Sequence, residues 1–250
     1  MAKYLSPEQI VEGIAVCSEN VESLFDDALS LFKNKKYARA ASLAVSCLEE
    51  CGKIEKLKEL FHIEKNEEER LKTFWKNFRS HEFKTTTALA TSTSRNQTKA
   101  IDAMNAFHHF EAMGKYREQI RRKGLYTDFD EQKNNWDSPR DILEEEAGEI
   151  LYAAQQAHLS IKADRISGMH SLESLTLRNK HFEPLWIFTR NREVDQGSLR
   201  EIDDVILKCQ ISFFKDLLNK NLLKDPTAIL IRGLSVKEFL KKFDSEYKNE

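Results

Sequence analysis

Apolar residues spaced three and four positions apart recur along most of the chain, which is the period of an amphipathic helix. The clearest stretch is 37–54, YARAASLAVSCLEECGKI, in which apolar and small residues cover well over half of the helix circumference. Its polar residues share one narrow strip, made of Arg39, Ser42, Ser46, Glu49, Glu50 and Lys53. A helix with so little polar surface is expected near the middle of a bundle, with the strip facing a thin band of water or a cleft.

Start and stop signals predict five helices in the first two thirds of the chain. The first begins at Ser6-Pro7, with Gln9 completing a capping box, and the second spans about residues 37–60. Asn66 and Glu69 predict the start of a third helix that carries Phe74 to His81. The Thr-rich and Ser-rich run 85–94 predicts a frayed end for it.

The last two of these helices have clear ends. Ser94 and Gln97 predict the start of the fourth, which ends at three cations, 121–123, with Gly124 left-handed just beyond. Ser138-Pro139 predicts a fifth helix that runs to about residue 163. Five helices joined by short turns predict an all-α antiparallel bundle.

The pattern changes at Ser167, where Gly and Pro begin to interrupt shorter elements. Helices are predicted over 198–219 and 235–243. The stretches 185–189 and 227–231 are apolar enough for short strands, although a helix turn or a buried loop gives the same pattern. We therefore predict a bundle domain over residues 1–166 and a mainly helical C-terminal extension over 167–250 whose role the sequence does not indicate.

Composition narrows the classes of function. The formal net charge of −2 over 250 residues gives no overall field that attracts nucleic acid, so any RNA contact must come from a local basic patch. No apolar run approaches the roughly 18 residues of a membrane span, and a signal peptide is not evident, so we expect a cytoplasmic protein. Cys47 and Cys51 lie within the apolar arc, where we expect buried thiols; neither a metal site nor a cofactor is predicted.

Candidate chemistry comes from three segments. Asn77, His81 and Lys84 follow each other at steps of four and three, so they line one ridge of the third predicted helix. Histidine suits proton transfer, and Lys and Arg suit the stabilisation of phosphate charge, which together favour RNA cleavage. The predicted catalytic residues are His81, Lys84, Glu49, Glu50 and Lys53, and the predicted RNA-binding or phosphate-binding residues are Arg121, Arg122 and Tyr126.

Each of these features also has a structural explanation. Glu49 and Lys53 have the spacing of an ordinary helix ion pair, and a histidine beside Phe74 and Phe78 is more often an interior side chain than a catalyst. Cations at 121–123 suit any helix C-terminus. Two carboxylates would also repel a phosphate unless Lys53, Lys84 or a divalent cation neutralised them.

Three blocks of the sequence resemble the AbiV-type abortive-infection proteins. They are S-x-x-E-E-x-G-K from Ser46 to Lys53, F-W-x-x-F-x-S-H-x-x-K from Phe74 to Lys84, and R-x-K-G-L-Y-x-D from Arg121 to Asp128. AbiV-type proteins are placed in the HEPN superfamily of helical bundles, many of which act on RNA in conflicts with phage. The resemblance, over roughly residues 20–165, implies a HEPN-like bundle that pairs as a homodimer.

The resemblance also implies a phage-defence effector that arrests growth or translation of the infected cell, with a phage protein as its trigger. HEPN ribonucleases carry Arg followed, after four to six residues, by His. Only Arg165 and His170 have this spacing, and roughly one such pair is expected by chance. Enzyme activity therefore stays open. The alternative is a non-catalytic helical binding module that recognises a phage or translation-apparatus protein, with the polar cluster as a buried structural network.

Overall fold

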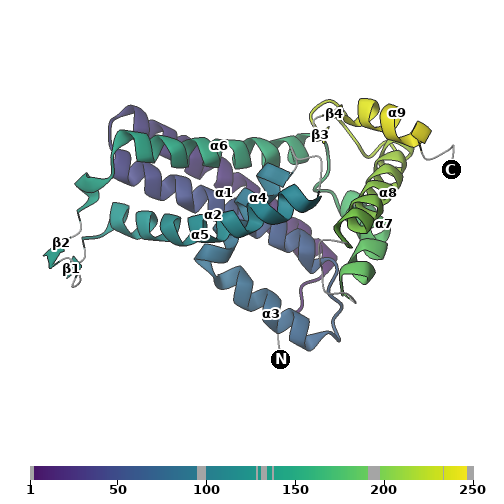
Figure 1. The fold of residues 1–250 in the computed structure, drawn as a ribbon, viewed down its shortest axis with the longest axis horizontal. Helices are drawn as coiled ribbons and strands as arrows, with labels where there is room; N and C mark the ends of the chain where they lie inside the picture. Colours follow the sequence, from purple (N-terminus) through teal and green to yellow (C-terminus); the bar gives the residue numbers. More distant parts are fainter. Residues whose placement is uncertain are drawn as a thin grey trace.

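The computed structural model describes residues 3–94, 100–127, 129–130, 134–136, 138–190, 198–232 and 234–246, which are mostly helical (Figure 1). The elements of the first part are α1 (Pro7–Lys33), α2 (Tyr37–Leu60), α3 (Glu68–Arg79), α4 (His81–Ser94), α5 (Ala100–Leu125), β1 (Phe129–Asp130), β2 (Asn135–Trp136), the 3-10 helix η1 (Pro139–Asp141) and α6 (Glu144–Ile166). They are followed by α7 (Leu172–Arg190), α8 (Ser198–Asn219), β3 (Leu230–Ile231), β4 (Leu234–Ser235) and α9 (Val236–Glu246). The all-α prediction is confirmed.

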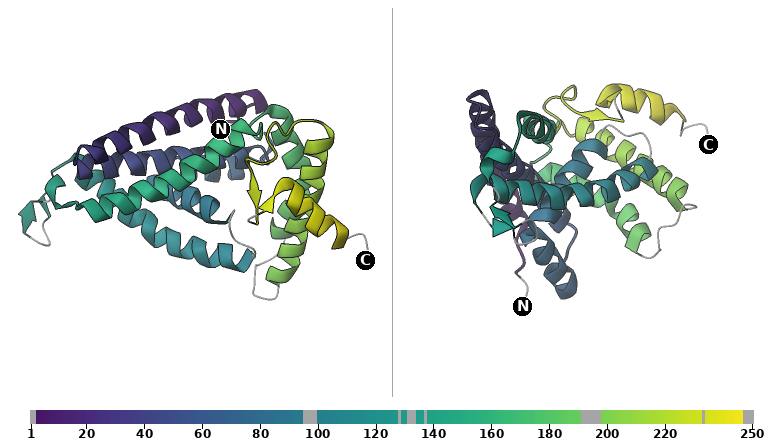
Figure 2. Two further views of the ribbon diagram at one scale, coloured as in Figure 1. Left: turned by 90° about the horizontal axis from the view of Figure 1, so that it is seen from above. Right: turned by 60° about the vertical axis from the view of Figure 1, so that its left-hand side comes forward.

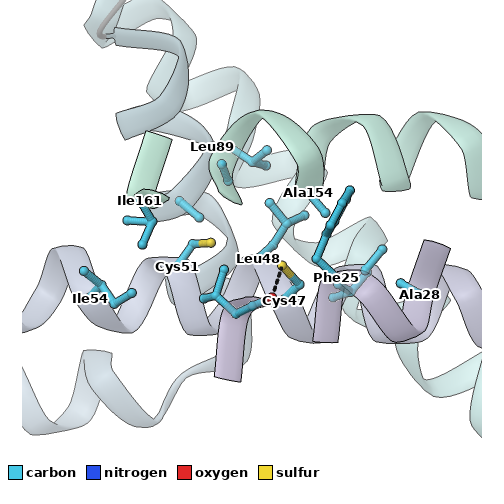
Figure 3. Close-up of a cluster of buried hydrophobic side chains, with 14 of the residues drawn as sticks. Phe25, Ala28, Cys47, Leu48, Cys51, Ile54, Leu89, Ala154 and Ile161 are labelled. Atoms are coloured by element: carbon cyan, nitrogen blue, oxygen red, sulfur yellow. Dashed lines mark hydrogen bonds between the residues drawn. The ribbon is translucent and has the colours of Figure 1, made fainter. Parts of the chain in front are cut away.

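Helix α2 lies at the centre of the bundle, as its wide apolar arc predicts, and packs against α1, α4, α5 and α6 (Figures 1 and 2). Its core side chains, Ala44, Val45, Cys47, Leu48 and Ile54, have no exposed surface. Figure 3 shows Cys47, Leu48 and Ile54 together with side chains from α1, α4 and α6. Full burial of a side chain the size of Val or Leu stabilises the fold by roughly 1.5–3 kcal/mol, so this one helix accounts for much of the core.

Two glycines allow neighbouring helices to approach α2 closely. A Cβ on Gly52 would lie 2.0 Å from the backbone oxygen of Lys84 in α4, and one on Gly124 would lie 2.1 Å from Ser42 Oγ. Gly124 therefore lies inside α5, where it lets that helix contact α2, and the prediction that it adopts a left-handed conformation beyond the helix was wrong.

The third predicted helix is two helices. Ser80 has extended backbone angles (φ −75°, ψ 120°), so α3 ends at Arg79 and α4 begins at His81. The prediction that Asn77 shares a ridge with His81 and Lys84 was wrong for this reason. The predicted Asn66 cap was also wrong: Glu67 precedes α3, and its carboxylate accepts a hydrogen bond from the Glu64 backbone N–H (2.8 Å).

Helix α4 continues through the Thr-rich run where fraying was predicted. The Thr85 and Thr87 hydroxyls donate to the carbonyl oxygens of His81 (3.1 Å) and Phe83 (2.8 Å) one turn earlier. Because each threonine hydroxyl finds its acceptor within the same helix, these residues can be accommodated without ending the helix. The predicted restart at Ser94 and Gln97 lies partly outside the described residues.

The fifth predicted helix starts later than the sequence suggested. Pro139–Asp141 forms η1, and α6 begins at Glu144 with three acidic residues in its first turn. Between α5 and η1, β1 and β2 pair antiparallel, with Phe129 opposite Trp136. This hairpin lies at the opposite end of the bundle from α7, α8 and α9 (Figure 1).

The C-terminal extension has an apolar cluster of its own, formed by α7, α8, α9 and β3 around Phe213, Leu217, Val236 and Phe239. Helix α8 has the predicted bounds, and α9 replaces the predicted 235–243 helix almost residue for residue. The predicted strand at 185–189 was wrong because α7 includes it, and the one at 227–231 is limited to β3. The domain division at residue 166 stays a prediction.

Within the described part of the chain, no helix is both long enough and apolar enough to cross a membrane.

We expect Gly52→Ala to destabilise the protein by about 3 kcal/mol, because the new Cβ meets the α4 backbone and the two helices must separate. Gly148→Ala in α6 is the matched control: its Cβ would lie 3.6 Å from Phe32, an ordinary contact. The control should be neutral or stabilising by up to about 1 kcal/mol, since alanine favours helix. Chemical unfolding measures both values; equal stability of the two variants would contradict the close approach.

A second prediction concerns pH. His62 follows α2, and its Nδ1–H donates to Asn179 of α7. Burial, together with the charge of Arg178, lowers the pKa of His62 to about 4. The unfolded chain therefore binds a proton near pH 6.5 that the folded protein takes up only near pH 4.

The stability contributed by neutral His62 is complete above pH 6.5 and is lost as the pH falls toward 4, by at most about 3 kcal/mol. We expect His62→Gln to flatten the pH dependence of the unfolding free energy in this window. Parallel curves for the two proteins would show that His62 is not held neutral.

Candidate functional site

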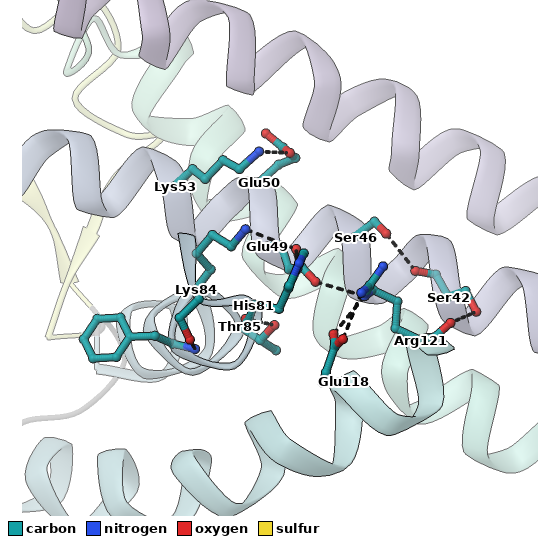
Figure 4. A network of polar contacts seen from close by, with 12 residues as sticks. Ser42, Ser46, Glu49, Glu50, Lys53, His81, Lys84, Thr85, Glu118 and Arg121 are labelled. Carbon is teal, nitrogen blue, oxygen red and sulfur yellow. Dashed lines mark hydrogen bonds and ion pairs between the residues drawn. The ribbon is translucent and has the colours of Figure 1, made fainter. Parts of the chain in front are cut away.

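The candidate site is a cluster of charged side chains around the buried carboxylate of Glu49, in the middle of α2 (Figure 4). His81 Nδ1 lies 2.7 Å and Lys84 Nζ lies 3.4 Å from Glu49 Oε2. Arg121 Nε lies 3.3 Å from the other oxygen, Oε1. The side chain of Glu49 is only 8% exposed, so three cationic or hydrogen-bonding groups from α4 and α5 replace the water it would otherwise bind.

His81 has two different sides. Because an ionised carboxylate can only accept, the imidazole donates its Nδ1–H to Glu49. The His81 side chain is 49% exposed, and in neutral imidazole the Nε2 atom then carries a free lone pair. His81 is also the first residue of α4, directly after the break at Ser80, and this break places it at the edge of the bundle.

Arg121 joins Glu49 to a second carboxylate, Glu118. Its Nε and one terminal nitrogen each lie 2.8 Å from a Glu118 oxygen, one turn earlier on α5. Burial alone would raise the pKa of Glu118, but the hydrogen bond and charge of Arg121, with the charges of His81 and Arg122, lower it. The hydrogen bond to Glu118 raises the pKa of Arg121. Glu118 and Arg121 are thus both held in their charged forms.

The other predicted pair lies apart from this cluster. Lys53 Nζ lies 2.5 Å from Glu50 Oε1, and both residues act electrostatically on Cys17 of α1. Burial, followed by the charge of Glu50, raises the pKa of Cys17 to about 12, so this thiol stays protonated. The predicted five-residue catalytic set therefore divides: Glu49, His81 and Lys84 meet, and Glu50 and Lys53 form a separate ion pair.

The predicted phosphate-binding residues lie in the last turns of α5 and directly after it. Arg121 is 20% exposed and is engaged by carboxylates, whereas Arg122 is exposed. Tyr126 is 60% exposed, and its backbone N–H bonds to Arg122 O (2.9 Å) at the end of α5. Lys84 is only 5% exposed, so it neutralises Glu49 from the buried side and is not available to a bound ligand.

The ligand atoms of Glu49, His81 and Glu118 lie within 4.8 Å of one another, a separation that could hold a metal ion. Their oxygen and nitrogen donors suit zinc or manganese. Arg121 and Lys84, however, already neutralise the two carboxylates, and Arg121 bridges them. A metal ion would have to displace Arg121, so these residues fit a metal poorly as they stand.

Arg165 and His170, the pair with HEPN spacing, do not form a site together. Arg165 is on the surface and pairs with Glu22 of α1 (2.9 Å). The His170 side chain is 11% exposed and lies 3.7 Å from Asp164, which pairs with buried Lys58 at 2.8 Å. Helix α6 ends at Ile166 and Gly168 turns the chain with φ +83°, so the two side chains leave in different directions.

The cluster also contains one residue that the sequence interpretation missed. Glu118 shares Arg121 with Glu49, and its i, i+3 spacing to Arg121 on a predicted helix was a usable signal. Ser42, by contrast, was part of the predicted polar strip, and its hydroxyl donates to Arg121 O (3.1 Å). Ser42 and Glu49 of the strip therefore face α4 and α5, whereas Glu50 and Lys53 lie near Cys17 of α1 and Arg39 is exposed.

Comparison with known families decides the assignment. The family model HEPN_AbiV, described as AbiV, matches residues 9–159. The chain belongs to the AbiV family of HEPN proteins. This confirms the resemblance in the three sequence blocks and the HEPN-like interpretation of the bundle, and it indicates a role in abortive infection. No curated protein and no solved structure matches the chain. The match ends within α6, so α7, α8 and α9 lie outside it.

We expect Glu49→Gln to destabilise this AbiV-family protein by about 3–5 kcal/mol, because it leaves Lys84 buried without its counter-charge. Glu50→Gln, at the next position of α2, removes one partly exposed ion pair and should cost at most about 1 kcal/mol. Denaturant unfolding of the two variants measures the contrast. Similar losses would mean that Glu49 is no more important to the fold than its neighbour.

Proposed function

We propose that this AbiV-family protein is an abortive-infection effector that arrests growth or translation of the infected cell by cleaving RNA, with His81 as its catalytic base. The observation that carries the proposal is the His81–Glu49 pair: a buried carboxylate binds Nδ1 of a half-exposed imidazole at 2.7 Å. This arrangement fixes the tautomer and turns Nε2 toward solvent, where a general base must be. The trigger would be a phage product encountered in the cytoplasm.

Each member of the cluster has a distinct part in this mechanism. His81 removes the proton of an RNA 2′-hydroxyl. Exposed Arg122 contacts the phosphate, and Arg121 supplies positive charge at the same edge of the bundle. Glu49 is a positioning residue that orients the imidazole. Lys84 is also a positioning residue, since its buried ammonium reaches Glu49 rather than the surface.

RNA cleavage by these groups requires no reactant other than the RNA and solvent protons. The 2′ oxygen forms a bond to phosphorus, the bond from phosphorus to the 5′ oxygen breaks, and the products are a 2′,3′-cyclic phosphate and a 5′-hydroxyl end. The proton taken by His81 is returned to solvent, and the departing 5′ oxygen takes one from solvent. Arginine suits the phosphate in this step because its charge and fork geometry match the developing negative charge.

A second function, a non-catalytic binding module, is favoured by the charge balance. Glu49 and Glu118 are matched by Lys84 and Arg121, and Glu49 and Lys84 are both buried. A network whose charges are balanced in this way can rigidify a bundle without doing chemistry. In that case the arrest arises through contact with a phage protein or the translation apparatus.

The two functions separate in a His81→Gln variant, whose side-chain amide can still donate to Glu49. If His81 is the base, we expect RNA cleavage by the purified protein to fall by about 100-fold or more. Phage defence should be lost, and the melting temperature should change little. The control is Arg165→Gln, which removes a surface pair of the HEPN-spaced Arg and should leave cleavage unchanged.

Sequencing of RNA from induced cells supplies the complementary measurement. New ends with 2′,3′-cyclic phosphates in cells with the unaltered protein, absent with His81→Gln, would support cleavage. Full arrest with intact RNA, or arrest that survives His81→Gln, would overturn the nuclease proposal and favour the binding module. Loss of cleavage in Arg165→Gln but not in His81→Gln would indicate that the active site lies near the C-terminal end of α6 and not at His81.

A further inference from the structure

One ridge of α5 leads away from the candidate site. Glu118, Arg122 and Tyr126 follow each other at steps of four, so they share one face of the helix. The Tyr126 backbone N–H donates to Arg122 O (2.9 Å), which extends the helical turn as far as Tyr126. Glu118 lies within electrostatic reach of both His81 and Arg122. The ridge therefore begins beside the proposed catalytic base and ends at an exposed tyrosine about 12 Å farther along the helix axis.

Exposed aromatic rings are concentrated where this ridge ends. Tyr126, Phe129 and Trp136 are 60%, 45% and 65% exposed, and they are three of the six exposed Phe, Tyr and Trp side chains in the part of the chain that the structure describes. The Phe129 and Trp136 rings meet edge to face across the hairpin, with centroids 5.4 Å apart. Figure 1 shows this hairpin projecting from the end of the bundle at which α5 ends. We call these three residues the aromatic surface; such a concentration is typical of a binding site.

The chemistry of the aromatic surface favours unpaired RNA as its occupant. Every base has a π face, so aromatic side chains stack on bases of any sequence. Bases inside a duplex are already stacked on their neighbours, so exposed rings can accept only the bases of a single strand. Single-stranded RNA also needs a cation for its phosphates, and exposed Arg122 lies one turn before Tyr126 on the same ridge.

Charge determines which part of this region can contact phosphate. Residues 128–137 include four acidic residues and one lysine, and carboxylates repel phosphate. Phosphate contacts are therefore expected from Arg121 and Arg122 at the end of α5, whereas the hairpin contributes ring faces. A protein partner rich in Lys or Arg would also suit acidic residues beside aromatic rings. The continuous ridge from His81 favours RNA, because it connects the rings to the group that would act on the RNA backbone.

We propose that the aromatic surface stacks unpaired bases next to the scissile phosphate and thereby restricts the protein to single-stranded RNA. This inference rests on the RNA cleavage proposed above. Arg122 holds a phosphate near His81, and Tyr126 stacks a neighbouring base one helical turn away, about 6 Å along the axis. Phe129 and Trp136 stack bases farther along the strand. The three aromatic residues determine substrate specificity and take no part in proton transfer.

Binding of intact RNA tests the aromatic surface separately from cleavage. In the full-length His81→Gln protein, fluorescence anisotropy measures the dissociation constants of a labelled unstructured RNA strand and of the same strand annealed to its complement. We expect the single strand to bind at least about tenfold more tightly than the duplex. Tyr126→Ala and Trp136→Ala should each weaken single-strand binding about tenfold, since each removes one stacking contact. Tyr126→Phe keeps the ring and should bind normally.

Tyr152→Ala on α6 is the matched control, because Tyr152 is exposed to nearly the same extent as Tyr126 (64%) and lies outside the aromatic surface. It should leave RNA binding unchanged. Equal affinity for single strand and duplex, or a Tyr126→Ala variant that binds as well as Tyr152→Ala, would overturn the proposal. Loss of phage defence in Tyr126→Ala with unchanged RNA binding would also overturn it and would indicate a cationic protein partner instead.

Tryptophan fluorescence and cleavage rates separate this inference from the nuclease proposal. Stacked bases should quench the fluorescence of Trp136, so the quenching caused by single-stranded RNA should be absent in Trp136→Ala; unchanged quenching in that variant would contradict stacking. Single-strand binding that requires the aromatic surface, without cleavage by the unaltered protein, would overturn the nuclease proposal but support the specificity. Cleavage of single-stranded and duplex RNA at equal rates would retain the nuclease and overturn the specificity.

Discussion

The structure depends on the way in which the carboxylate of Glu49 is buried. An isolated carboxylate in the interior of a bundle would cost several kcal/mol, because the protein cannot solvate it as water does. Here the charge is matched by Lys84 and Arg121 and is hydrogen-bonded to His81. These partners come from α4 and α5, so the same charge fixes how both helices sit against α2. The packing of the bundle and the position of the candidate catalytic histidine thus have a common cause.

The close packing of helix backbones makes these contacts possible. Gly52 and Gly124 lie where α4 and α5 approach α2, on either side of Glu49 along the bundle. Without side chains at these positions, the two helices come near enough for Lys84 and Arg121 to reach the carboxylate. The break at Ser80 then turns the start of α4 outward, so that His81 is half exposed while Lys84, one turn later, is buried.

Sequence patterns predicted the large features of this protein because those features follow from local spacing. The arc of α2 gave its central position, and the Ser6–Gln9 capping box gave the start of α1. The convergence of Glu49, His81 and Lys84 was also predictable from the polar strip and the AbiV-type blocks. What local spacing could not predict was set by contacts between helices.

Gly124 has the sequence pattern of a helix stop, but it lies within α5. Glycine is needed at this position because a Cβ would lie 2.1 Å from Ser42 Oγ of α2. Ser80 did carry a signal for the break, because serine favours N-caps and its hydroxyl accepts a hydrogen bond from the Phe83 backbone N–H (3.2 Å) at the start of α4. The continuous helical spacing on both sides of Ser80 hid this signal, and without the break Asn77 would have been expected beside His81. Lys53 pairs with Glu50 and not with Glu49 because of the side-chain conformations that the neighbouring helices allow. Helical periodicity does not determine these conformations.

The order of elements along the chain determines when Glu49 can be neutralised during synthesis. Arg121 follows Glu49 by 72 positions (121 − 49), and α5 is the last of its partner helices to be made. At typical elongation rates, this delay is roughly 4–14 s. His81 and Lys84 of α4 follow Glu49 by 32 and 35 positions (81 − 49 and 84 − 49), so the carboxylate meets these two partners before Arg121 is made. Its second oxygen, which lies near Arg121, has no charged partner until α5 has emerged, so the nascent bundle is expected to close fully around Glu49 only at that later stage.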